Sequence, residues 1–214
     1  MPQKIEGILE GPTDDELVFK GNLALWNYNG VWNNIIQKYH SKIILEEVKD
    51  ASSAFYQDLS TFDISDMSIK LSNVYHSISL NGMFNTTRKT KFPKITGAAK
   101  VSIGSMFNSN TNLKELPDDY FNFVSSLIYN CQTVFYNCFS LRKLPTSFCE
   151  KVKTYPNASS THVYNKMIYG CYCLDEVVNL GVCNTVALKD RFFYDCFYKC
   201  NRLKRFTFES NQIA

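Results

Sequence analysis

The sequence predicts an α/β solenoid of about five to six irregular helix-turn-strand repeats, with a cap at its N-terminus. Three observations support this prediction. A short phrase recurs four times between residues 107 and 207, and apolar side chains recur within each copy at spacings that fit one face of a helix. The composition, with 45% hydrophobic and 20% charged residues in a chain of 214, is typical of a folded globular domain.

The repeated phrase reads FNSNTNLKELP, FYNCFSLRKLP, IYGCYCLDEVV and FYKCNRLKRFT, and a degenerate copy precedes these four. We take the first residue of each copy as its anchor. The spacings between successive anchors are 23, 28, 33 and 29 residues, and the anchors are Phe84, Phe107, Phe135, Ile168 and Phe197.

The start of each copy is predicted to be a short helix with one buried face. Apolar or small residues recur four and one residues before the anchor, at the anchor and three residues after it, which follows the 3.6-residue turn of an α-helix. The position three after the anchor carries Cys138, Cys171 and Cys200. The chain has no C-x-x-C pair that would indicate zinc and no secretory signal that would indicate an oxidising compartment, so we interpret its cysteines as small, buried and reduced residues.

The end of each copy is predicted to be a brief strand. Apolar residues occur six and nine residues after the anchor, a charged pair lies between them, and Pro117 or Pro145 closes two of the copies. Stacking would bury the apolar side of each unit against its neighbour, and longer inserts such as residues 145–165 would project as loops. The leucines expected in one buried column are Leu113, Leu141, Leu174 and Leu203.

The first residues of the chain do not show the repeat. Residues 1–44 contain both tryptophans, Trp26 and Trp32, and the end repeat of a solenoid needs a cover for its apolar edge. We therefore predict an N-terminal cap or docking segment at 1–44 and a solenoid domain at 45–214.

The form M-F-x-x-C-x-x-L-x-x-L resembles the BspA-like leucine-rich repeat, which occurs in bacterial surface antigens, some protist proteins and phage-encoded proteins. Residues 54–67, AFYQDLSTFDISDM, are similar to a second phrase of that family. The resemblance covers roughly residues 45–208. It implies a leucine-rich-repeat-like, right-handed solenoid that binds rather than catalyses.

Several classes of function are not indicated. There is no apolar run long enough to span a membrane and no secretory signal, so we expect a soluble protein made in the cytoplasm, with no membrane partner. A net charge of +3 does not indicate a nucleic-acid partner. The sequence has neither a phosphate-binding loop nor metal-ligand spacing, and we predict no cofactor, no metal and no catalytic residues.

Two groups of residues are candidates for interaction. Tyr136, Tyr169 and Tyr198 share the position after the anchor and are expected either to pack at the boundary of the core or to recognise a protein or glycan. The second group lies at the C-terminal edge, where we expect a surface of Leu203, Phe206 and Phe208 fringed by Arg202, Lys204 and Arg205. We expect this edge to contact a partner protein or a second copy, unless the N-terminal segment or a long loop covers it.

The sequence thus favours a non-catalytic interaction protein that binds another protein or a glycan. One alternative is a structural or assembly subunit of a phage, an oligomer within the virion whose repeats serve as packing surface. A less favoured alternative is an enzyme in which His40, His76 or His162 meets a cysteine in space.

Overall fold

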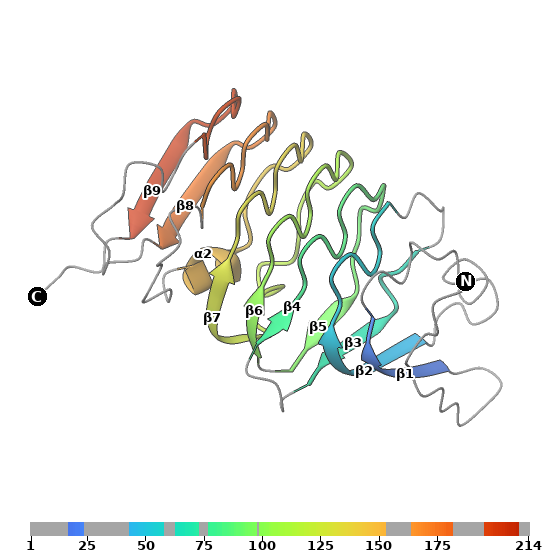
Figure 1. The fold of residues 1–214 in the computed structure, drawn as a ribbon. Coiled ribbons are helices and arrows are strands. Elements are labelled where there is room, and N and C mark those ends of the chain that lie inside the picture. The colour runs from blue at the N-terminus through green and yellow to red at the C-terminus, as the bar shows by residue number, and fades with distance from the viewer. Residues whose placement is uncertain are drawn as a thin grey trace, which may run out of the picture.

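The computed structural model describes residues 17–23, 43–57, 63–72, 77–97, 99–152, 164–181 and 195–209. Nearly all of its regular elements are parallel β-strands, which lie side by side in Figure 1. In chain order the elements are β1 (Leu17–Asn22), β2 (Ile43–Asp50), β3 (Ser68–Leu71), β4 (Ile78–Ser79), β5 (Lys94–Thr96), β6 (Ala99–Ser102), β7 (Val124–Asn130), α2 (Thr146–Val152), β8 (Glu176–Gly181) and β9 (Arg205–Glu209).

The strands stack in layers along the chain. β2 pairs with β1 on one side and with both β3 and β4 on the other, so β3 and β4 together form the strand of the next layer. β5 and β6 pair with β3 and β4 in the same way, and β7 pairs with β6. A second sheet, formed later in the chain, contains β8 and β9, which pair in parallel.

The prediction of helix-turn-strand repeats in an α/β solenoid is wrong. Each anchor lies in a run of four-residue turns, in which the N–H before the anchor donates to the carbonyl three residues earlier, as from Val134 to Cys131 at 3.2 Å. The N–H three residues after the anchor donates to the anchor carbonyl in the same manner. Among the described residues the α-helix is α2, which lies inside the insert predicted to be a loop.

Left-handed backbone conformations explain why these segments are not helices. The residues two before and two after each anchor have positive φ, for example Gly82 at 62° and Thr86 at 57° around Phe84. A residue with positive φ interrupts a right-handed helix and suits the third position of a type II turn. Successive turns still bring residues three and four apart to one side, so their apolar spacing imitates that of a helix.

Backbone hydrogen bonds join the turns of successive layers. The N–H two residues before an anchor donates to the carbonyl three residues before the next anchor. The N–H of the anchor donates to the carbonyl one residue before the next anchor, and the N–H two residues after it donates to the carbonyl one residue after the next anchor. Around Phe84 these bonds run from Gly82, Phe84 and Thr86 to the following layer at 2.7–2.9 Å. We call this ladder side the turn face, formed by residues 52–57, 81–86, 104–109, 132–137, 164–170 and 195–199.

The anchors form a continuous buried column behind the turn face. The rings of Phe55, Phe84, Phe107 and Phe135 stack with centroids 5.3–5.6 Å apart. Three of the four leucines expected in the adjacent column are fully buried, whereas Leu203 in the last described layer is only partly buried.

The cysteine column links the layers through side chains. The Sγ atoms of Cys138, Cys171 and Cys200 each donate to the anchor carbonyl of the preceding layer at 3.0–3.1 Å. Asn110 occupies the same position one layer earlier and donates its side-chain amide to the carbonyl of Phe84. The prediction of buried cysteines is confirmed for Cys131, Cys138, Cys149, Cys171 and Cys196; Cys173 and Cys200 are half-buried, and Cys183 lies outside the described residues.

Part of the predicted cap continues the sheet. β1 pairs in parallel with β2, with Leu17 opposite Ile43, and Leu23 after it is buried. Trp26 and Trp32 lie outside the described residues. Within the ranges given above, none of the helices has the length and apolar character needed to cross a bilayer.

We expect Leu141→Ala to lower the free energy of unfolding by about 2–5 kcal/mol, because Leu141 is fully buried and its truncation leaves a cavity. Arg142→Ala is the control, since that neighbouring side chain is exposed and its loss should change stability by less than about 0.5 kcal/mol. Urea unfolding followed by circular dichroism measures both. Equal stability of Leu141→Ala and the wild type would contradict this register.

Stability should also fall in alkaline solution. Burial raises the pKa of Cys138 from 9.0 to about 12, so its stabilising contribution is full below pH 9 and is lost as the pH rises from 9 to 12. Cys138→Ser keeps a donor to Phe107 but removes this titration, and its decline above pH 9 should be shallower by up to about 1.4 kcal/mol per pH unit. Val134→Ala, a buried change without a thiol, should decline like the wild type; equal slopes for all three proteins would refute the linkage.

Candidate functional site

The candidate site is a row of three stacked tyrosines on the turn face. Tyr136, Tyr169 and Tyr198 each follow their anchor by one residue, so the backbone ladder places them at equivalent positions in neighbouring layers. The ring centroids of Tyr136 and Tyr169 lie 4.8 Å apart with 13° between the ring planes. Those of Tyr169 and Tyr198 lie 5.1 Å apart with 30° between the planes. The structure therefore brings together the three tyrosines that the sequence places in one column, and we call them the tyrosine row.

The stacking decides which parts of the rings face solvent. Tyr169 has a tyrosine ring against each of its faces, so a ligand meets its edge and hydroxyl rather than its face. Tyr136 and Tyr169 are half-buried, and Tyr198 is 53% exposed. Stacked pairs of this kind contribute about 0.5–1.5 kcal/mol beyond their buried area, which fixes the rings before any partner arrives.

Two lysines lie beside the row. The Nζ of Lys166 is 5.8 Å from the ring centroid of Tyr169, and the Nζ of Lys199 is 5.6 Å from that of Tyr198. A cation at this distance from an aromatic ring interacts favourably with it. The row thus combines aromatic edges, hydroxyl groups and positive charge.

The same column is polar in the two layers that precede the row. Asn85 and Asn108 occupy the position after the anchor, and their side-chain oxygens accept hydrogen bonds from Thr86 and Ser109 at 2.6 and 2.7 Å. A shallow hollow of about 460 Å³ opens on this part of the turn face. Its lining is formed by amide, hydroxyl and glycine residues, namely Ser53, Asn81, Gly82, Asn85, Gly104, Ser105, Asn130, Gln132 and Thr133.

A second aromatic contact lies three residues after Tyr136 and Tyr169, in the same two layers. The rings of Phe139 and Tyr172 have centroids 5.1 Å apart, and Phe139 is 37% exposed. The sequence analysis did not single out this pair or the polar hollow. The signal for the pair was present, since both residues lie four after their anchors.

The C-terminal candidates lie in the last described layer. Arg202, Lys204 and Arg205 are exposed, and two of them form ion pairs with the preceding layer, from Arg202 to Asp175 at 3.0 Å and from Arg205 to Glu176 at 3.8 Å. Phe206 is partly buried and contacts the core, with its ring centroid 4.6 Å from that of Phe197. Phe208 lies in β9, and contact of this edge with another chain stays a prediction.

The enzyme alternative requires a histidine close to a reactive cysteine. His40, His76 and His162 lie outside the described residues. Burial raises the pKa of Cys131, Cys138, Cys171 and Cys196, which disfavours the thiolate needed for nucleophilic attack. In the described part of the chain, no group of three or more His, Cys, Asp and Glu residues could hold a metal ion.

No protein-family model, no curated protein and no solved structure matches this chain.

Proposed function

We propose that the chain is a non-catalytic interaction protein that binds another protein through the tyrosine row. The observation that carries this proposal is the stacking of Tyr136, Tyr169 and Tyr198 along the turn face. Tyrosine is enriched in protein interfaces because it combines a large apolar ring with a hydrogen-bonding hydroxyl. The resemblance to BspA-like repeats supports the same class of function.

The ring orientation favours a protein over a glycan. A sugar ring that packs on an aromatic side chain requires an open ring face. Both faces of the central ring, Tyr169, are occupied by neighbouring tyrosines, which leaves at most the outer faces of Tyr136 and Tyr198 for such packing. Edges, hydroxyls and the nearby Lys166 and Lys199 instead suit a partner with carbonyl and carboxylate groups. The row is also pre-organised, so binding loses little side-chain entropy.

We expect Tyr169→Ala to weaken binding of the partner protein by at least about 2 kcal/mol, roughly thirtyfold, because it removes the centre of the row. Tyr56→Ala is the matched control, since Tyr56 follows Phe55, which stacks on Phe84 in the anchor column and lies in the first layer of the turn face. It should change affinity by less than about threefold. The partner is captured by wild-type protein from extracts of the source organism, purified, and titrated against each variant by calorimetry.

Thermal unfolding of both variants controls for folding, which should be retained because backbone groups form the ladder. Equal binding by Tyr169→Ala and the wild type would contradict the proposed interface. Saturable binding to a glycan array, lost in Tyr169→Ala and accompanied by no captured protein, would assign the row to a glycan instead.

A further inference from the structure

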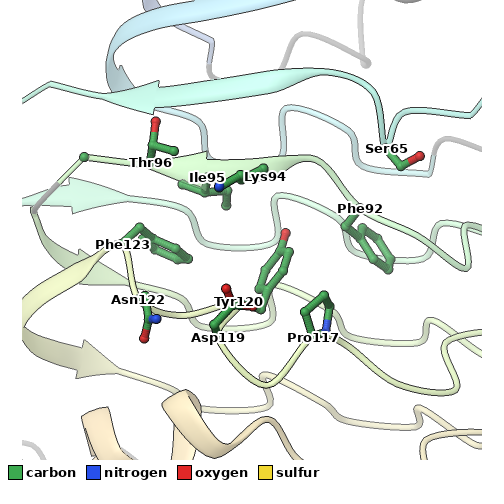
Figure 2. A pocket seen from close by; sticks show the side chains of 11 residues that line it. Ser65, Phe92, Lys94, Ile95, Thr96, Pro117, Asp119, Tyr120, Asn122 and Phe123 are labelled. Atoms are coloured by element: carbon green, nitrogen blue, oxygen red, sulfur yellow. The ribbon is translucent and has the colours of Figure 1, made fainter.

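A strand edge opens into a pocket on the side of the stack away from the turn face. Figure 2 shows β5 above the segment that contains Pro117, Asp119 and Tyr120, with the side chain of Tyr120 directed into the space between them. The pocket has a volume of about 520 Å³, within the range of small ligand sites. β5 stands at the end of the strand order, pairing with β3, and none of the other described strands lies on its second side.

The fold of the next layer explains the open edge. β7 pairs with β6 from Val124 onwards, but the chain just before it turns back on itself instead of extending along β5. Successive hydrogen bonds of 2.9–3.0 Å close these turns, from Tyr120 to Pro117, from Asn122 to Asp119 and from Val124 to Phe121. The turns bury Tyr120 and Phe121 in the core, so the layer cannot also supply a strand beside β5.

We propose that this edge binds an extended peptide segment of a partner protein, which adds to β5 as a further strand. The backbone edge of a strand presents alternating N–H and carbonyl groups, and another extended backbone is the ligand that matches that spacing. β5 already forms such a pairing with β3, where Ile69 lies opposite Ile95 and Ser68 lies opposite Lys94. The inference concerns a site separate from the tyrosine row.

The lining of the pocket defines the side chains of the peptide. Phe92, Ile95, Tyr120 and Phe123 are buried and form its apolar part, which accepts an aliphatic residue. Tyr120 is held in place by its hydroxyl, which donates to the carbonyl of Pro93 at 3.2 Å. Exposed polar groups surround this part, so polar residues should flank the aliphatic one; they are Lys94, Thr96, Asp119 and Asn122.

Lysines outnumber carboxylates by four to three in the pocket and the hollow beside it, which slightly favours an acidic residue in the peptide. A neighbouring hollow of about 740 Å³ shares Ser65, Phe92 and Pro117 with the pocket and extends it along the stack. In this hollow Asp118 is paired with Lys143 at 3.0 Å, and their hydrogen bond lowers the pKa of the Asp118 carboxyl. The other charged groups that line the two hollows are three exposed lysines and two carboxylates, namely Lys91, Lys94, Lys114, Glu115 and Asp119.

A capped synthetic peptide with the sequence of residues 66–72, DMSIKLS, is a suitable probe. It contains an aliphatic residue between polar ones, an acidic residue, and the strand that already pairs with β5. Titrated into isotopically labelled full-length protein, it should shift the amide resonances of residues 94–97 and 119–123 and slow hydrogen exchange in β5. Shifts confined to other residues, or their absence at saturating peptide, would overturn the proposal.

Two N-methylated forms of the peptide test strand addition itself. One form is methylated at the amides of residues 68 and 70, and the other at those of residues 67, 69 and 71. Because alternate amides of a strand face the same neighbour, one form should lose binding and the other should retain it. Equal affinity of the two forms, whether retained or lost, would contradict pairing with β5.

Protein variants locate the site independently. Asn122→Trp places a large ring in the pocket and should weaken peptide binding by about tenfold or more, whereas Thr111→Trp adds the same ring at an exposed position outside the pocket and should have an effect below about twofold. Tyr169→Ala should leave peptide binding unchanged, which separates this site from the tyrosine row. An equal loss in both tryptophan variants would contradict the location.

Discussion

The backbone ladder along the turn face is the interaction on which the rest of the structure depends. Three N–H groups per layer donate to carbonyls of the next layer at 2.7–3.0 Å, and the pattern repeats from Phe55 to Phe135. The turns need positive φ at two positions per layer, and this conformation is supplied by glycine at Gly82 and Gly170 and by polar residues elsewhere. Since backbone atoms carry the ladder, side chains on its outer side can vary from layer to layer without breaking the stack.

That freedom accounts for the change of character along one column. The position after the anchor holds Asn85 and Asn108 in two layers and then the tyrosine row in the following three. The layer repeat brings consecutive rings to 4.8 and 5.1 Å, close to the separation at which aromatic pairs stack. The same regularity fails on the other side of the stack, where burial of Phe121 draws the chain away from β5. Both candidate sites are therefore consequences of one repeat, kept in the first case and interrupted in the second.

The spacing of apolar residues in the sequence predicted burial better than it predicted backbone conformation. Phe107, Leu113 and Cys138 are buried where the repeat places them, because apolar spacing reports which side of the chain faces the core. It does not distinguish a helix from successive turns, since both bring residues three and four apart together. A glycine two before or two after an anchor, as at Gly82 and Gly170, was the available sign of left-handed turns. Non-glycine residues such as Thr133 at φ 53° gave no comparable signal.

For the candidate sites, too, the sequence indicated which residues share a column but not how they are arranged in space. The column that holds Tyr136, Tyr169 and Tyr198 was visible in the sequence, but the stacking that covers both faces of Tyr169 was not. The pocket beside β5 was not predicted, because it depends on turns after Pro117, where the sequence indicated only the end of a strand.

The ladder also gives the turn face an electrical polarity. In each of its peptide units the carbonyl points toward the preceding layer and the N–H toward the following one, so their dipoles add along the stack as they do along a helix. The positive end of this macrodipole lies toward the later layers, where Tyr198 and the exposed Lys199 are placed. An acidic surface that approaches the turn face would therefore meet a favourable backbone potential at that end of the tyrosine row.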